Sequence, residues 1–227
     1  MAVNPAGPRI TYYDDATGER IELSTATLAN WAAKTANLLR DELNARPDSR
    51  VAVLLPAHWQ TAAVLFGIWW IGCEVVLDGS DCEIAFCTEE RLDEADAAVG
   101  TGSGMGEVVV LSLDPFGKPV PGLPVGVTDY ATSVRVHGDQ IVPERNPGPA
   151  LDGRSVDDVI AAARTSAAAQ GLTGADRQLS TAGWCTADDL INHLLAVYVV
   201  GASLVQVANP ESALLDRHRD TEKTTRG

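Results

Sequence analysis

The sequence predicts an α/β fold with largely parallel sheets flanked by helices, and three observations lead to this prediction. Residues 24–77 follow the order helix, strand, helix, strand, and residues 155–207 repeat it. The expected strand at residues 51–55 is short and wholly apolar, as in strands that helices cover on both faces. Strands that alternate with helices form parallel sheets with right-handed crossovers. We therefore expect two pseudo-repeated helix–strand–helix–strand units.

The chain opens with two short strands and a long helix. Residues 10–13 and 19–23 carry β-branched and aromatic side chains and are joined by a turn. Ser24 or Thr25 is placed to cap the next helix, because a side-chain oxygen there accepts a hydrogen bond from the first turn. The helix is expected to reach about Leu43, with one apolar stripe.

Two apolar runs follow in the first copy. Residues 51–55 are expected to form a strand that is covered on both faces. Residues 57–71 are apolar nearly all round, which is typical of a buried helix, and Gly72 ends it. The other elements expected in this half are a strand, a helix and a strand at residues 75–77, 88–98 and 108–111.

The second copy begins at Ser155, where Asp158 is placed to complete a capping box. That helix should run to about Gln170. The next expected elements are a strand, a helix, a strand and a final helix at residues 177–181, 186–200, 204–207 and 210–219. Residues 222–227 should fray, as chain ends often do.

The two copies correspond in detail as well as in order. Arg50 and Arg177 open the first strand of each copy, and Gly72 and Gly201 end the two buried helices. Glycine suits such an end because it adopts positive φ angles without a steric penalty. We expect the two copies to form the same local structure.

A proline- and glycine-rich segment joins the two copies. It predicts mostly irregular chain, with a small hairpin over residues 133–136 and 140–142. We expect one compact domain of two lobes: a first α/β unit over residues 1–113, the connection over residues 114–153 and a second α/β unit over residues 154–227.

Composition excludes several classes of function. The net charge of −14 argues against nucleic acid or an anionic membrane as a partner, because both favour clusters of Lys and Arg. Two long uncharged stretches are interrupted by Pro56 and by residues 201–203, so neither predicts a membrane span. The four cysteines and four histidines lack the spacing of a metal site. Unpaired thiols and no signal peptide predict a cytoplasmic protein.

Both copies resemble parts of one family. In the first copy, residues 10–12, 28–39, 50–56 and 62–72 resemble the amino-terminal domain of the adenylate-forming enzymes, which include acyl-CoA synthetases, peptide-synthetase adenylation domains and luciferases. In the second copy, residues 172–182 and 190–210 are similar to a later segment of that domain. The resemblance implies the fold of that domain in truncated form. The chain is also similar to short actinobacterial proteins of unknown function.

The chain departs from this family where the family binds ATP. Family members carry a Thr-Ser-Gly-Thr-Thr-Gly-x-Pro-Lys-Gly loop whose amides and Lys hold the phosphates. At that place this chain has residues 146–153, without Lys, Ser or Thr. Thr186 stands where the family often has a pocket-gating His, and Asp189 where a Gly is usual. Binding of ATP, AMP or coenzyme A is therefore not supported by motifs, and no cofactor or catalytic residue is assigned.

A small-molecule cleft is nevertheless expected at the carboxyl ends of the strands, where open α/β sheets bind ligands. Trp184 offers an apolar wall there, and Cys185, Thr186 and Asp188 offer polar groups. His58 and Trp59 occupy the equivalent corner of the first copy. The alternative is structural: Thr186 caps the helix and the aspartates favour its first turn.

Other readings have less support. The glycine-rich residues 100–106 fit neither phosphate-loop spacing and lead into a strand, so they predict a connection. The function expected is a non-catalytic binding or interaction protein that forms a homodimer or binds a protein partner. Two alternatives stay open: one piece of a split acyl-adenylating enzyme that a partner completes, and an unrelated hydrolase or transferase that uses Cys185 or Ser180.

Overall fold

The computed structural model describes residues 4–100 and 106–227 and has the predicted α/β fold. The chain divides into two compact units that interleave in sequence. The four-stranded unit comprises the residues up to Leu28, Pro56–Trp59 and Asp157–Gly227. The five-stranded unit comprises Ala29–Leu55 and Gln60–Val156.

The four-stranded unit is built on a mixed sheet with the order β2-β1-β9-β8. Its strands are β1 (Pro8–Asp14), β2 (Glu19–Ser24), β8 (Arg177–Ser180) and β9 (Ser203–Ala208). Strands β1 and β2 form an antiparallel hairpin, whereas β1, β9 and β8 run parallel to one another. The parallel pairing brings the first strand of the chain beside the last one.

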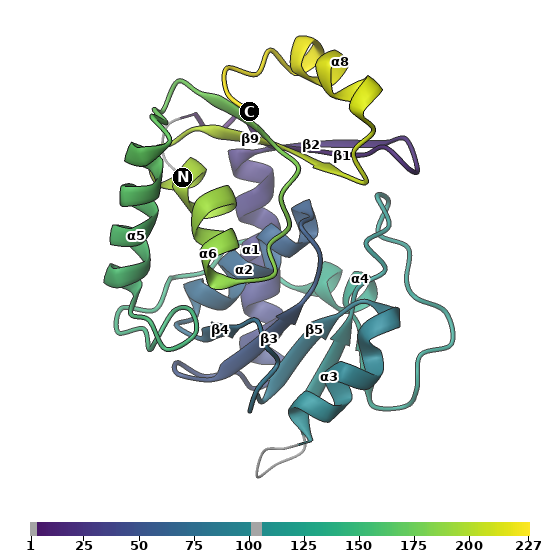
Figure 1. Ribbon diagram of the computed structural model, residues 1–227. Coiled ribbons are helices and arrows are strands. Elements are labelled where there is room, and N and C mark those ends of the chain that lie inside the picture. Colours follow the sequence, from purple (N-terminus) through teal and green to yellow (C-terminus); the bar gives the residue numbers. More distant parts are fainter. Residues whose placement is uncertain (1–3, 101–105) are drawn as a thin grey trace. The chain divides into compact units, whose positions relative to one another are not determined.

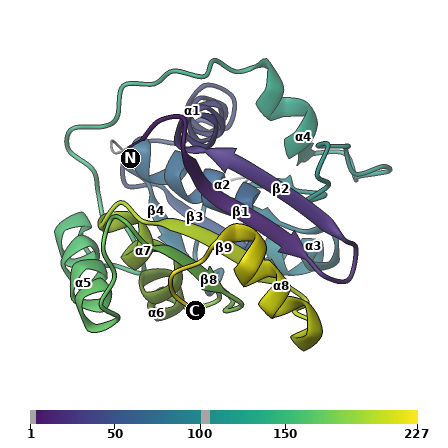
Figure 2. The same cartoon turned by 90° about the horizontal axis from the view of Figure 1, so that it is seen from above.

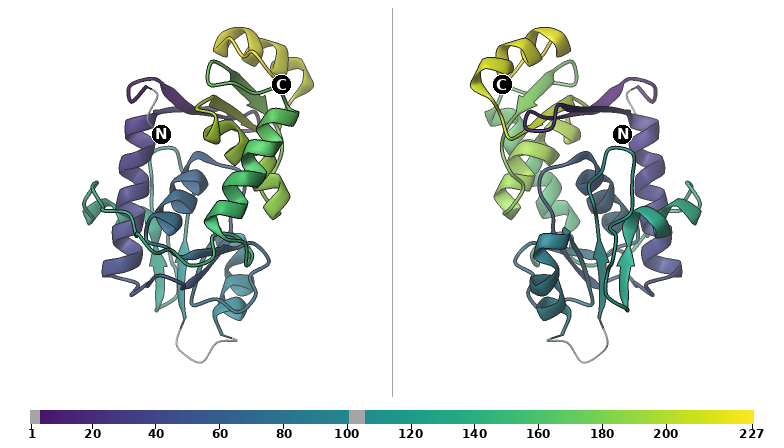
Figure 3. Two further views of the ribbon diagram at one scale, coloured as in Figure 1. Left: turned by 90° about the vertical axis from the view of Figure 1, so that its left-hand side faces the viewer. Right: turned by 90° about the vertical axis from the view of Figure 1, so that its right-hand side faces the viewer.

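Helices cover both faces of this sheet (Figures 1 and 2). Helix α8 (Ser212–Glu222) lies on one face. On the other face lie α6 (Ala187–Leu190), the π-helical segment η3 (Ile191–Leu195) and α7 (Ala196–Val199), which form one continuous rod. Helix α5 (Val156–Ala169) lies on the side away from α8, as both side views show (Figure 3).

The five-stranded unit contains an all-parallel sheet with the order β4-β3-β5-β6-β7. Its strands are β3 (Arg50–Leu54), β4 (Glu74–Val76), β5 (Ile84–Cys87), β6 (Glu107–Val110) and β7 (Val127–Asp129). Its helical elements are α1 (Thr25–Asp41), α2 (Trp59–Trp70), η1 (Glu89–Arg91), α3 (Leu92–Val99), α4 (Tyr130–Ser133) and η2 (Val134–Val136).

Helices flank this sheet on both sides, with α3 on one face and α1 and α2 on the other (Figures 1 and 3). Alternate residues of β3, β5 and β6 form a core with α3. Helices α1 and α2 approach each other closely at Gly67, where an added Cβ would lie 2.8 Å from the Thr35 Cβ and 2.9 Å from the Ala32 carbonyl oxygen. Only glycine fits this crossing without a shift of the neighbouring helix.

The predicted correspondence between the two copies is present in the structure. Strand β3 lies parallel to β4 with Arg50 opposite Glu74, and β8 lies parallel to β9 with Arg177 opposite Ser203. Gly72 and Gly201 follow the buried helices with positive φ angles of 78° and 87°. The two copies belong to different sheets. Because β1 pairs with β9, the compact units do not divide the chain at residues 113 and 153.

The predicted hairpin in the connection is wrong. Residues 130–136 are helical instead, because the Asp129 carboxylate accepts a hydrogen bond from the Thr132 amide and caps a helical turn. The carbonyls that follow bond to side chains of α1: His137 accepts from Lys34 at 2.6 Å, and Gly138 accepts from Asn37 at 2.8 Å. Strands β5 and β7 were not predicted.

The prediction that residues 222–227 fray is also wrong. The Thr225 amide donates to the Arg177 carbonyl at 2.9 Å, and the Arg226 carbonyl accepts from the Leu179 amide at 2.9 Å. The last residues therefore lie along β8. Glu222 is buried and anchors this segment from the end of α8.

Two further expectations concern membrane crossing and the glycine-rich connection. In the part of the chain that the structure describes, no helix combines the length and the apolar character that crossing a bilayer requires. Of the glycine-rich connection at residues 100–106, residues 101–105 lie outside the described residues.

Candidate functional site

The residues around Trp184 are placed by the structure mainly in structural roles. The Trp184 indole is only 2% exposed, so it faces the protein interior rather than forming an open wall. The Thr186 hydroxyl accepts a hydrogen bond from the Asp189 amide at 3.1 Å, and the Asp189 carboxylate accepts one from the Thr186 amide at 3.0 Å. This is the capping box of α6. Cys185 and Asp188 are exposed beside it.

His58 and Trp59 lie in the same four-stranded unit, in the interior. The His58 ring is edge-on to Tyr12 at 4.3 Å between centroids and 5.6 Å from the nearer ring of Trp59. Its Nε2 lies 3.8 Å from the Glu19 carboxylate. Burial lowers the pKa of His58, and the Glu19 carboxylate opposes this only in part. The imidazole is therefore neutral at pH 7.

The cysteines differ sharply in accessibility. All four are free thiols, of which Cys185 is exposed and the other three are buried. Burial raises the pKa of Cys73 to about 12 and that of Cys87 to about 11. These two thiols are protonated at neutral pH and are therefore poor nucleophiles. Among the described residues, no group of three His, Cys, Asp or Glu is arranged to hold a metal ion.

The sequence resemblance places residues 146–153 where adenylate-forming enzymes have their phosphate loop. Each of its backbone amides already donates to an oxygen of the protein. The amides of Gly148 and Asp152 donate to the carbonyls of Gly72 and Val75, at 3.2 and 3.0 Å. The remaining donors, Asn146, Ala150, Leu151 and Gly153, are bonded within the same five-stranded unit. Pro147 and Pro149 have no amide hydrogen to offer.

Carboxylates also surround this segment. The buried Glu74 side chain accepts from the Gly153 amide at 2.5 Å and pairs with Arg50 at 3.4 Å. The Asp152 carboxylate accepts from the Leu77 amide at 3.3 Å. Burial raises the pKa of Asp152, and the nearby Asp78 and Glu74 raise it further. An anion-binding nest presents free backbone amides to its ligand. This segment has no free amide and has carboxylates beside it, so it is unsuited to hold a phosphate.

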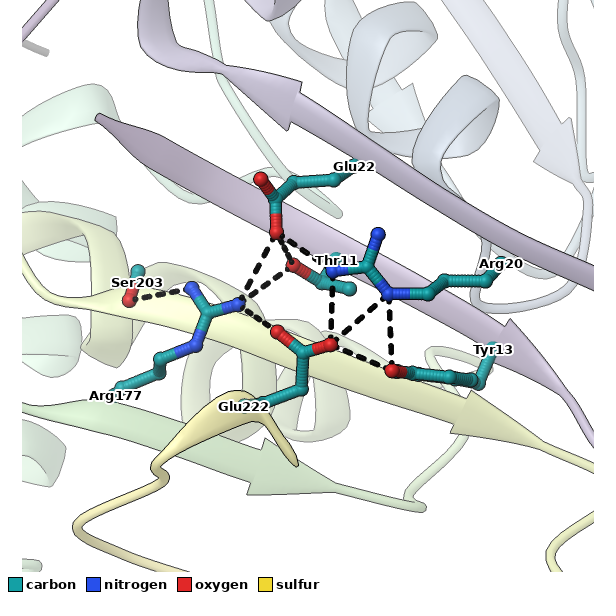
Figure 4. A network of polar contacts seen from close by, with 7 residues as sticks. All are labelled: Thr11, Tyr13, Arg20, Glu22, Arg177, Ser203 and Glu222. Atoms are coloured by element: carbon teal, nitrogen blue, oxygen red, sulfur yellow. Dashed lines mark hydrogen bonds and ion pairs between the residues drawn. The ribbon is translucent and has the colours of Figure 1, made fainter. Parts of the chain in front are cut away.

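A buried network of charged groups lies on the α8 face of the four-stranded sheet (Figure 4). Its centre is Glu222, whose side chain is 4% exposed. One carboxylate oxygen accepts from Tyr13 and, at 2.9 Å, from Arg20, while the other accepts from Arg177. Arg177 also donates to Thr11 at 2.8 Å. Glu22 and Ser203 complete the set.

The charges in this network balance and hold Glu222 ionised. Burial by itself would raise the pKa of Glu222, but hydrogen bonds from Tyr13, Arg177 and Arg20 outweigh it and lower the pKa. Two guanidinium groups thus face two carboxylates, those of Glu22 and Glu222. The sequence analysis missed this cluster, because Glu222 lies 209 residues from Tyr13 and 202 residues from Arg20 along the chain.

Two hollows open on the four-stranded unit, and neither is lined by the six residues that the sequence singled out. The Arg9 hollow, of about 470 Å³, is lined by Arg9, Thr25, Arg177, Ser203, Glu222 and Lys223, among others. The His218 hollow, of about 290 Å³, is lined by Tyr13, Asp15 and His218, among others. His218 Nε2 lies 2.8 Å from the Asp15 carboxylate. The predicted cleft near Trp184 remains a prediction.

Solved structures with the same fold are acyl-CoA synthetases and related ligases. An acyl-CoA synthetase from Brucella canis matches 99% of this chain with a TM-score of 0.77 and 15% identity. A benzoate CoA ligase from Burkholderia xenovorans LB400 matches 95% with a TM-score of 0.71 and 17% identity. The anthranilate CoA ligase AuaEII, solved in complex with anthranoyl-AMP, matches 96% with a TM-score of 0.70 and 16% identity.

These matches cover only 44 to 45% of the solved chains. The chain thus has the fold of a truncated relative of the acyl-CoA synthetase amino-terminal domain, as the sequence predicted. No family model matches the chain. A protein of Mycobacterium tuberculosis (strain ATCC 25618 / H37Rv), described as a TIGR03089 family protein, is 68% identical over 226 residues, which cover 100% of this chain and 93% of that protein. At this identity and coverage, the chain belongs to the TIGR03089 family.

Proposed function

We propose that this protein is a non-catalytic binding or interaction protein that retains an acyl-CoA synthetase-like fold without its phosphate loop. The observation that carries the proposal is the internal bonding of residues 146–153, whose amides all donate to the protein itself. Phosphate binding by a loop needs amides that point at the ligand and a favourable charge. Here Glu74 and Asp152 supply negative charge instead.

The ligand of such a protein would be a small molecule in the cleft expected near Trp184. His58 and Trp59 belong to the same four-stranded unit as Trp184 and Cys185. The exposed Cys185 thiol offers a reporter for that site, since the three buried thiols react slowly under the same conditions. The unpaired thiols also fit a reducing compartment, and we place the protein in the cytoplasm.

A partner is the second part of the proposal. Four large apolar side chains of the five-stranded unit are more than three-quarters exposed: Phe116, Val125, Val136 and Val142. Arg135 donates to the Phe116 carbonyl at 2.9 Å, which keeps Phe116 close to the turn that carries Val136. Exposed apolar side chains that lie close together, as Phe116 and Val136 do here, favour an interface. We propose a homodimer or a protein partner at this surface.

The decisive experiment is a thermal-shift screen with MgATP, AMP, coenzyme A, acyl-CoA compounds and carboxylic acids. A ligand at 100 times its dissociation constant stabilises the folded state by about 2.7 kcal/mol, which raises Tm by roughly 5–10 °C in a chain of this length. We expect no shift with MgATP. A shift with an acyl compound or carboxylic acid should be accompanied by slower alkylation of Cys185.

Two outcomes would contradict the proposal. One is a shift with MgATP together with pyrophosphate release that depends on a carboxylic acid, which would make the protein an adenylating enzyme. The other concerns the partner: a monomer by light scattering at tens of micromolar, with no change when Phe116→Ser is introduced, would remove the proposed interface. Pyrophosphate release only after addition of a second protein would favour the split enzyme.

A further inference from the structure

The Arg9 hollow differs in charge from the rest of this acidic protein. Three cationic residues, Arg9, Arg177 and Lys223, line it together with two acidic residues, Asp176 and Glu222. Its volume of about 470 Å³ falls within the range of small-molecule sites. Its lining residues all belong to the four-stranded unit. The hollow lies where β8 and β9 begin, at the opposite end of these strands from the Trp184 segment.

The two acidic residues of the lining are fully engaged with other groups. The Asp176 carboxylate accepts from Thr173 and Thr225, both at 2.7 Å, and lies 3.4 Å from the Arg226 guanidinium. Glu222 is shared between Arg20 and Arg177 in the network of Figure 4. Neither carboxylate is therefore available to balance the other cations of the hollow.

Neither Arg9 nor Lys223 pairs with a carboxylate among residues 4–100 and 106–227. Arg9 is 5% exposed and donates to the carbonyls of Ala202 and Tyr198 at 2.7 and 3.0 Å. Its Nε has no hydrogen-bond partner in the described part of the chain. A buried cation with an unused donor is costly to maintain unless a counter-charge approaches it.

We propose that the Arg9 hollow binds a small anion that carries a carboxylate or a phosphate group. Arg9 supplies a fixed positive wall, because its two carbonyl contacts and the Tyr198 ring, 4.1 Å below it, hold the guanidinium in one orientation. Lys223 supplies a second, adjustable charge from the end of α8. Hydroxyl groups of Thr25 and Ser203 in the lining offer further hydrogen bonds.

This site is independent of the phosphate-loop position, which belongs to the other unit. The proposed function fails if MgATP binds and is cleaved, whereas this inference fails if simple anions do not bind. The two failures are therefore distinguishable. The test uses inorganic phosphate and succinate as probes, with sodium chloride at matched ionic strength, and measures binding by calorimetry and by amide chemical shifts.

The matched variants are Lys223→Asn and Lys118→Asn. Asn suits the left-handed backbone of Lys223, where φ is 51°, so the first variant removes a charge without strain. Lys118 is exposed on the five-stranded unit and controls for the same change in net charge. We expect Lys223→Asn to weaken anion binding about tenfold, as for loss of a charge-assisted hydrogen bond, and Lys118→Asn to leave it unchanged.

The probes also identify the class of ligand. Binding of phosphate alone indicates a phosphate-bearing ligand, binding of succinate alone indicates a carboxylate, and either result supports the proposal. Chemical-shift changes should centre on residues 7–9, 174–177 and 223–225. Saturable binding of neither probe, equal loss in both variants, or shifts centred elsewhere would overturn it.

Discussion

The two helix–strand–helix–strand copies share a topology, but the arginine that opens the first strand of each copy pairs with a carboxylate from a different source. Arg50 starts β3 and pairs with Glu74, which lies opposite it on the neighbouring strand. Arg177 starts β8, but the residue opposite is Ser203; its nearest carboxylate is that of Glu222 on α8, and Glu22 on β2 lies farther away at 3.5 Å. The first copy thus carries its counter-charge within the repeat, whereas the second depends on a helix that follows it. Equal patterns in sequence therefore need not have equal sources of stability.

The helices of the two copies differ as well. Helix α2 is regular over Trp59–Trp70, whereas the helix of the second copy contains a π-helical segment at Ile191–Leu195. The first copy needs Gly67 for close packing against α1. Counted back from the glycine that ends each helix, the matching residue in the second copy is the fully buried Ala196. The second copy therefore has an alanine at the position where close packing in the first copy requires a glycine.

The largest effect is expected from Glu222→Ala. The substitution removes the buried carboxylate that Arg177 and Arg20 share and leaves them only the partly exposed Glu22, at 3.5 and 3.0 Å. Loss of one member of a buried ion pair typically costs about 3 kcal/mol or more. Glu74→Ala should cost less, because the Arg50 side chain is 32% exposed and therefore better solvated than that of Arg177, which is 13% exposed. Urea unfolding of both variants measures the difference. Equal losses of unfolding free energy in the two variants would show that Arg177 and Arg50 depend equally on their carboxylate partners.

The pH dependence of stability should follow from the same network. The pKa of Glu222 is lower in the folded protein than its ordinary value of 4.5, so its contribution to stability is present above that pH and is lost as the pH falls through the folded pKa. The difference in unfolding free energy between the natural protein and Glu222→Gln should therefore shrink below about pH 4.5. A difference that stays constant to pH 2.5 would contradict this assignment, provided that both proteins remain folded.

Gly67→Ala should destabilise the protein by about 1–3 kcal/mol, since overpacking forces neighbouring groups to shift. The new Cβ would meet Thr35 and Ala32 at under 3 Å, as the separations of 2.8 and 2.9 Å show. The control is Ala196→Gly in the second copy, where the expected loss of about 1 kcal/mol comes from helix propensity. Thermal unfolding checks both. A stabilising Gly67→Ala would mean that α1 and α2 move apart without cost.

The smallest effect is expected from Thr186→Ala, which removes the capping box of α6 and should cost about 1 kcal/mol. Thr186→Ser keeps the hydroxyl and should restore most of the stability. Ligand binding near Cys185 separates the structural role from a functional one. If Thr186→Ser preserves stability and Thr186→Ala abolishes binding of an acyl compound, the hydroxyl also contacts the ligand.

Much of the fold was predictable because its signals are local. The apolar run at residues 51–55 that became most of β3 reflects burial, and the glycines that end the two buried helices reflect positive φ angles. Both signals lie in neighbouring residues. The capping role of Thr186 was likewise predicted as the structural alternative. Strand β7 was missed because its three residues, Val127–Asp129, form no apolar run. Strand β5 is a four-residue apolar run comparable to β6 and could have been predicted.

The candidate sites were harder to predict than the fold. The residues around Trp184 were chosen because ligands of open α/β sheets bind at the carboxyl ends of the strands. That rule does not predict whether the Trp184 indole faces the solvent or the protein interior. The Arg9 hollow gathers Arg9, Arg177 and Lys223 from three distant parts of the chain. No spacing in the sequence relates these residues, because the pairing of β1 with β9 brings them together.

The sequence by itself determined the α/β class, the repeated order of elements and the absence of a lysine-bearing loop at residues 146–153. These properties depend on side-chain periodicity, turn residues and residue identity, all of which are local. Only the tertiary structure decided that Glu222 is the common partner of Arg20 and Arg177, that the amides of residues 146–153 are occupied, and that a cationic hollow exists. Such features depend on which distant segments pack together, because charge and hydrogen bonding act through space and not along the chain.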